Sequence, residues 1–139
     1  MRQVLYALAL SCILALPGQA AEFVLYPGAT LDEAATKEAM EAAAAAKMTG
    51  VKTAIYTTSD AFAKVAKFYQ GMGTEYAMPR ASGVSGQPKK SAEYDLWEAY
   101  FILDGAKGLA SSKRWVKVQR PYIGEAVQDV TAIVVTEKK

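Results

Sequence analysis

Residues 51–72 read VKTAIYTTSDAFAKVAKFYQGM, a strand pattern followed directly by a helix pattern. From Val51 to Thr57 the residues alternate in polarity and many are β-branched, which indicates a β-strand. From Ser59 to Met72 apolar residues recur at intervals of three and four, which indicates an amphipathic helix. Its apolar stripe comprises Phe62, Val65, Ala66, Tyr69 and Met72, and is widened by Phe68. Such a stripe packs on an apolar surface, and together with the strands that follow along the chain this stretch predicts an α+β fold in which the helix covers a sheet.

The rest of the chain supplies the strands for that sheet. Residues 94–103, 113–120 and 127–136 have strand patterns, residues 75–78 form a short candidate, and residues 22–26 have an extended pattern. The strand over 127–136 is apolar on both faces near its end, which indicates a central position. Short connections favour antiparallel pairing. We therefore expect a single antiparallel sheet of four to five strands, with the amphipathic helix packed on one face.

A second helix is predicted upstream, beginning at a capping box. Thr30 and Glu33 have the spacing at which each side chain bonds the other residue's backbone N–H. The helix should extend to about Met48, with Gly50 closing it. Residues 42–46 are all alanine, which favours helix but offers little apolar area to bury. We therefore expect this alanine-rich helix to be peripheral and to lie near an edge of the sheet.

The first twenty residues have the order of a secretory signal peptide. A positive start at Arg2 precedes an apolar run over residues 4–16, then Pro17-Gly18 and small residues up to Ala20. We expect cleavage near Ala20, a single α+β domain over residues 21–139 with no transmembrane segment, and a periplasmic or secreted location. Two alternatives stay open at this point: lipoprotein anchoring through Cys12, and a retained membrane anchor.

The composition narrows the chemistry of the remaining domain. The chain has no histidine, and its one cysteine, Cys12, lies in the segment expected to be removed. Histidine acid–base catalysis, thiolate catalysis and sites built from histidine or cysteine ligands are therefore excluded. We expect no enzymatic activity, no cofactor and no metal site. The net charge of +2 argues against a dedicated nucleic-acid binder, and we expect no nucleic acid as partner.

The loop over residues 79–92 is the first candidate binding segment. It contains glycines, hydroxyl side chains and the basic residues Arg80, Lys89 and Lys90. A phosphate-binding P-loop needs glycine directly before its lysine and a helix after it, and neither is present. The loop is interpreted as a flexible surface loop, with binding of an anionic group by these three residues as the functional alternative.

The strand over 113–120 is the second candidate. Strand alternation places Lys113, Trp115 and Lys117 on one face and the guanidinium groups of Arg114 and Arg120 on the other. Basic residues next to an aromatic ring suit anionic partners such as lipid headgroups or anionic glycans. The alternative is an edge or solvated strand that its charges keep from pairing with other chains.

An uncovered sheet face would add a third feature. Tyr100 and Glu98 share one face of the strand over 94–103, and with Trp115 they would line a shallow ligand groove if no helix covers them. Trp97 belongs instead to the core face with Phe101. The alternative for these aromatic residues is ordinary core or surface packing.

Two stretches resemble a known group of proteins. Residues 26–29 read YPGA, and residues 56–60 read YTTSD and lead into a helix with Phe68-Tyr69 near its end. The pair resembles small exported bacterial proteins of unknown function, in which a YPGA turn precedes a strand ending in a Y-T-x-D element and a helix ending in F-Y. The resemblance covers residues 23–72. It implies export and a bacterial envelope setting, and it carries no catalytic residues.

Together these features favour an exported binding module without enzymatic activity, whose partner is a small molecule, a lipid or an envelope protein. One alternative is a partner-binding inhibitor or homodimeric structural protein of the envelope, because the small side chains of the alanine-rich helix allow close approach of another backbone. Another is a histidine-free hydrolase, for which Glu93 with Asp95, or Glu98 with Asp104, would supply paired carboxylates.

Overall fold

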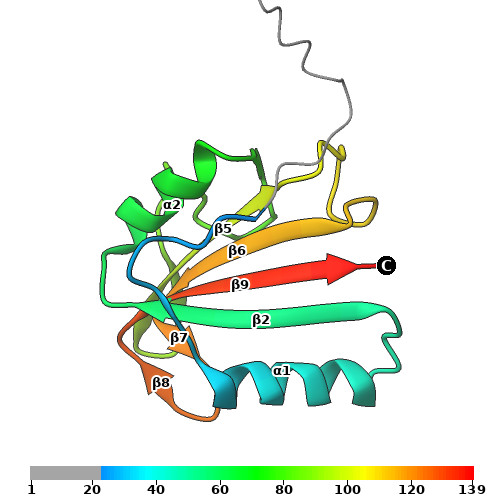
Figure 1. The fold of residues 1–139 in the computed structure, drawn as a ribbon. Coiled ribbons are helices and arrows are strands. Elements are labelled where there is room, and N and C mark those ends of the chain that lie inside the picture. The colour runs from blue at the N-terminus through cyan, green and yellow to red at the C-terminus, as the bar shows by residue number, and fades with distance from the viewer. Residues whose placement is uncertain (1–22) are drawn as a thin grey trace, which may run out of the picture.

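The computed structural model describes residues 23–139. The expected signal peptide, its cleavage near Ala20 and the lipidation alternative at Cys12 lie outside the described residues. Figure 1 shows one sheet with a helix, α2, over part of it and a second helix, α1, running beside strand β2. No helix within residues 23–139 is long and apolar enough to cross a membrane.

The described residues form two helices and nine strands. In chain order these are β1 (Thr30–Leu31), α1 (Glu33–Ala45), β2 (Val51–Thr58), α2 (Phe62–Gln70), β3 (Thr74–Tyr76), β4 (Lys89–Ser91), β5 (Tyr94–Ile102), β6 (Arg114–Arg120), β7 (Tyr122–Ile123), β8 (Val127–Gln128) and β9 (Thr131–Lys138). The α+β class that residues 51–72 predict is confirmed.

The main sheet is antiparallel and has the strand order β1-β2-β9-β6-β5-β3, with β4 also paired to β5. β9 lies between β2 and β6, so the central position expected from its apolar faces is confirmed. The expected four to five strands are too few, because the sheet has seven and a separate β7–β8 pair adds two. The unexpected strands are two or three residues long, and such segments have no periodicity of their own.

The main core lies between α2 and one face of the sheet. Phe62, Val65, Ala66 and Tyr69 of α2 are buried there, as the stripe predicts. The sheet contributes its inward side chains: Ala99, Phe101 and Leu103 at β5, Val116 and Val118 of β6, and Ile133 and Val135 of β9. The helix is shorter than expected, since regular α-helix covers Phe62–Gln70 rather than 59–72.

α1 packs on the opposite face of the sheet, against β2. Its contact is small: Ala35 packs with Ile55 and Ala132, with Ala39 and Tyr122 beside them. This is the peripheral position that the alanine content predicts. The predicted capping box is wrong, because Thr30 pairs with Thr57 in β1 and Asp32 is the N-cap, its carboxylate accepting from the Ala35 N–H at 2.9 Å. The helix also ends at Ala45 rather than near Met48.

The first described residues are attached to the α2 side of the core. The Tyr69 hydroxyl accepts from the Tyr26 N–H at 3.0 Å and donates to the Val24 carbonyl at 3.1 Å. At the expected turn the Ala29 N–H donates to the Tyr26 carbonyl at 3.1 Å, and Gly28 has a φ of 82°, which explains the glycine there. These contacts hold residues 23–29 across the core, although they form no strand.

Candidate functional site

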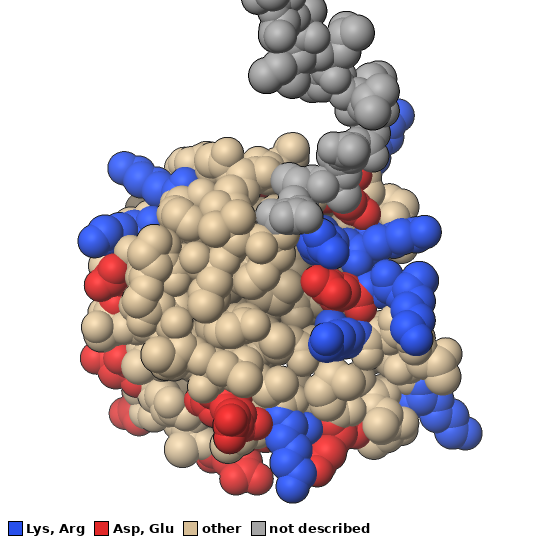
Figure 2. Space-filling view, in the orientation of Figure 1, with Lys and Arg blue, Asp and Glu red and all other residues tan. Residues whose placement is uncertain are grey.

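Antiparallel pairing brings basic residues from separate segments to one end of the sheet. Val51 at the start of β2 lies opposite Lys138 at the end of β9, and Arg114 at the start of β6 lies opposite Glu137. The Lys139 N–H donates to the Gly50 carbonyl at 2.9 Å, which joins the α1–β2 connection to the same end. We call this region the basic end; it comprises Lys47, Lys52, Lys113, Arg114, Lys138 and Lys139. Figure 2 shows lysine and arginine side chains gathered on the right, where Figure 1 marks the C-terminus.

Most members of the basic end make no ion pair with another described residue. Arg114 Nε lies 3.4 Å from a carboxylate oxygen of Glu137. None of the ion pairs between described residues involves the other members of the basic end, Lys47, Lys52, Lys113, Lys138 and Lys139. Within the described residues the basic end is therefore a region of unpaired ammonium groups.

Trp115 connects the basic end to the sheet face opposite α2. The register places Trp115 and Lys117 of β6 next to Ile102 and Tyr100 of β5 on this face. Lys138 Nζ lies 4.9 Å from the centre of the Trp115 ring, within the range of a cation–π contact. α1 packs on β2 and α2 packs on the other face, so neither helix packs over Trp115 and Tyr100.

Lys117, Tyr100 and Glu98 form a partly buried polar group on the same face. Lys117 Nζ lies 3.6 Å from a Glu98 oxygen and 5.7 Å from the Tyr100 ring centre. Burial raises the pKa of the Tyr100 hydroxyl, and the Glu98 charge adds to the effect. Tyr100, Trp115 and Glu98 therefore share one face, as strand alternation predicts, but Lys117 is already neutralised by Glu98.

Arg120 has a structural role on the α2 side. One terminal nitrogen donates to the carbonyls of Ser59 and Asp60 and to the Thr131 hydroxyl, at 3.4, 3.2 and 3.0 Å. The other donates to the Asp129 carbonyl and carboxylate, both at 3.1 Å. These bonds tie the start of α2 to the start of β9, so the guanidinium is held in place by the protein itself.

The loop over residues 79–92 is fastened to the edge of β5. Ser82 bonds the backbone of Glu98 twice at 2.9 Å, and the Val84 N–H donates to the Glu75 carboxylate at 2.9 Å. Lys90 pairs with Asp95 at 2.7 Å, whereas Arg80 and Lys89 are exposed. Lys89 lies opposite Leu96, far along β5 from the Ile102 position that neighbours Trp115. The structure therefore does not bring the loop cations together with the basic end.

Three of the four carboxylates proposed for hydrolysis have a local partner, and the fourth, Glu93, is exposed. Asp104 accepts from the Ser112 hydroxyl at 2.7 Å and from the Lys113 N–H at 2.6 Å. Burial of Asp104 raises its pKa, but these hydrogen bonds outweigh that effect and the net shift is downward. Ser112 is only 1% exposed, so its contact with Asp104 secures the β5–β6 connection. Glu98 is paired with Lys117, and Asp95 with Lys90.

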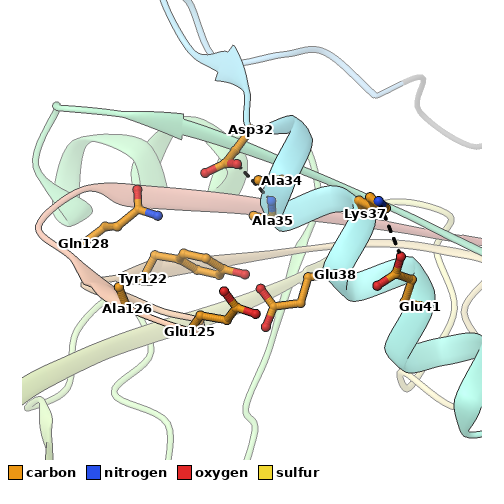
Figure 3. A pocket seen from close by; sticks show the side chains of 11 residues that line it. Asp32, Ala34, Ala35, Lys37, Glu38, Glu41, Tyr122, Glu125, Ala126 and Gln128 are labelled. Carbon is orange, nitrogen blue, oxygen red and sulfur yellow. Dashed lines mark hydrogen bonds and ion pairs between the residues drawn. The ribbon is translucent and has the colours of Figure 1, made fainter.

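The structure contains two pockets that the sequence does not predict. The first, with a volume of about 370 Å³, lies between α1 and the β7–β8 hairpin. Figure 3 shows the carboxylates of Glu38 and Glu125 facing one another near the Tyr122 hydroxyl, with Asp32 above them. Burial raises the Tyr122 pKa, and the charges of Glu38 and Asp32 add to the effect. No group of three or more acidic, histidine or cysteine residues in 23–139 has a geometry that could hold a metal ion.

The second pocket has a volume of about 390 Å³ and lies at the start of α2. Its walls come from three separate parts of the chain, the start of α2, β5 and β6: Ser59, Ala61, Phe62, Ala63, Trp97 and Arg120. Of the residues expected to bind a ligand, Arg120 lines this pocket. The sequence predicts that Trp97 belongs to the core; the residue packs against the core and also forms a wall of the pocket.

In comparisons with known proteins, no family model, curated protein or solved structure matches the chain.

Proposed function

We propose that this chain is an exported binding module without enzymatic activity, and that its basic end binds an anionic lipid surface. The observation that carries the proposal is the set of unpaired lysines that three strands and one loop bring together. Each lysine near an anionic bilayer contributes about 1 kcal/mol of attraction. Export itself rests on the order of residues 1–20.

Apolar side chains at the basic end favour a membrane over a soluble polyanion. Met48, between Lys47 and Gly50, is 51% exposed. Trp115 contacts Lys138 and is half-buried, and tryptophan prefers the boundary between headgroups and acyl chains. An exposed methionine and a tryptophan among lysines have the composition of a surface that rests on a bilayer without crossing it.

Vesicle binding tests the proposal. The protein purified after export should cosediment with vesicles of phosphatidylcholine that contain phosphatidylglycerol, and not with phosphatidylcholine alone. The variant K52Q/K113Q/K139Q should bind the anionic vesicles about 100-fold more weakly, which corresponds to about 1 kcal/mol for each lysine. Added salt should weaken wild-type binding because it screens the attraction.

A matched variant distinguishes the basic end from general charge. K64Q/K67Q/K89Q removes the same charge at exposed lysines outside the basic end and should bind like the wild type. Equal losses in the two triple variants, or equal binding to neutral vesicles, would overturn the proposal.

In a W97F background Trp115 is the sole tryptophan, and its emission should shift to the blue on anionic vesicles.

A further inference from the structure

The pocket at the start of α2, here called the α2 pocket, lies on the opposite side of the sheet from the exposed face of Trp115. Trp97 and Arg120 occupy facing positions on β5 and β6, and Phe62 is the first residue of α2. Its volume of about 390 Å³ falls within the range of small-molecule sites. Because its lining residues are not part of the basic end, it is a separate feature from the proposed lipid-binding surface.

Two aromatic rings form the apolar part of this pocket. The rings of Phe62 and Trp97 have centres 5.7 Å apart and planes inclined by 33°. Phe62 is 5% exposed, whereas Trp97 is only partly buried and presents part of its surface to the pocket. Planar aromatic molecules suit such walls because offset and edge-to-face ring contacts add to the gain from burying apolar area.

Small residues keep the pocket open beside the rings. Ala61 and Ala63 are both exposed and line the opening, with Ser59 next to them. A larger side chain at either alanine would occupy the space. The pocket therefore stays open because both of these positions at the start of α2 are alanine, whose side chain is a single methyl group.

The polar wall is rigid before any ligand arrives. Arg120 makes hydrogen bonds to Ser59, Asp60, Asp129 and Thr131, and the Thr131 hydroxyl donates to the Asp60 carbonyl at 2.6 Å. Binding to such a wall requires little ordering of side chains, which lowers the entropic cost. Among the described residues, the lining also contains no carboxylate that could pair with a cationic ligand.

We propose that the α2 pocket binds a small planar aromatic molecule that is neutral or anionic, with its ring against Trp97 and Phe62. The proposal is independent of lipid binding, because it uses no residue of the basic end.

The indole N–H signal of Trp97 provides a direct measurement. The chain has two tryptophans, so in W115F the remaining indole signal in a nitrogen–proton NMR spectrum belongs to Trp97. Phenol and benzoate should shift this signal with a dissociation constant of about 1 mM, as expected for ligands with so few atoms. Cyclohexanol, which has a similar size but no planar ring, should bind at least about tenfold more weakly, and benzylamine should leave the signal unchanged.

Filling the pocket is the decisive control. In the W115F background, A63L should weaken phenol binding by about tenfold or more, because the leucine side chain takes the space of the ring. Q70L adds a leucine at an exposed position at the other end of α2 and should leave phenol binding unchanged. If A63L does not fold, A61L provides a second filling variant at the rim.

Three results would overturn the proposal. These are no shift with phenol or benzoate up to about 10 mM, unchanged phenol binding in the folded filling variant, and benzylamine binding as tight as that of benzoate. Loss of vesicle binding in K52Q/K113Q/K139Q with phenol binding intact would separate the two sites.

Discussion

Tyr69 shows how much one side chain holds together. It is 0% exposed, and its hydroxyl bonds the backbone of both Tyr26 and Val24. Its ring stacks on Phe23 with centres 6.0 Å apart and meets Phe68 edge-on at 5.1 Å. The helical spacing identified Tyr69 as a core residue, but nothing in the sequence paired its hydroxyl with residues more than forty positions away.

Removing that hydroxyl should destabilise the fold. Y69F leaves the buried Tyr26 N–H without an acceptor, and we expect the free energy of unfolding to fall by about 2 kcal/mol. Y94F, which removes a hydroxyl with no hydrogen bond in the structure, should change it little. Urea denaturation followed by circular dichroism measures both, and equal effects would contradict this role for Tyr69.

The same hydroxyl should give stability a dependence on alkaline pH. Burial raises the pKa of Tyr69 to about 12, whereas an unfolded chain has an ordinary tyrosine pKa. The pKa of Tyr69 is higher in the folded state than in the unfolded state. The stability that the neutral phenol contributes is therefore fully present below about pH 10, and it is lost as the pH rises through the folded-state pKa. The stability difference between wild type and Y69F should therefore shrink above about pH 10. A constant difference across this range would contradict the burial of Tyr69.

At the scale of elements, the two helices differ in how the sheet holds them. α2 buries four side chains, whereas α1 buries only Ala35. The capping-box prediction failed because local spacing does not show which hydroxyl or carboxylate reaches a free N–H. Pairing of Thr30 with Thr57, and the bond from the Asp32 N–H to the Ile55 carbonyl at 2.9 Å, place the helix start two residues later.

A pair of substitutions tests the cap. D32A should lower the free energy of unfolding by about 1 kcal/mol and speed hydrogen exchange in the first turns of α1, because the Ala35 N–H loses its acceptor. T30A should have a smaller effect, since the Thr30 side chain makes no cap. If T30A proves the more damaging change, the cap is at Thr30 after all.

At the scale of the whole molecule, charge is segregated along α1. The pocket between α1 and the β7–β8 hairpin is lined by acidic residues, Glu38 among them, and Lys47 lies just beyond the end of this helix of 13 residues, about 14 Å along the helix axis from Glu38 at the usual rise per residue. Opposite charges at two ends favour head-to-tail contact between copies, the geometry that produces open chains rather than closed pairs.

Light scattering should detect this contact. At low ionic strength the apparent mass should increase with protein concentration, and added salt should reverse the increase. E38Q/E125Q should abolish the increase while leaving vesicle binding intact, whereas E93Q/D95N, which removes equal charge elsewhere, should retain it. A constant mass at every salt concentration would show that the two ends do not associate.

The sequence by itself determined the α+β class, the stripe of α2, the central position of β9 and the inward residues of β5 and β6. Each depends on local periodicity, which a single strand or helix displays without its neighbours. Only the tertiary structure decided the two-residue strands, the Asp32 cap, the two pockets and the basic end. Those features depend on which distant residues become neighbours. The register of the antiparallel sheet determines these neighbours, and no single segment of the chain contains the information that sets the register.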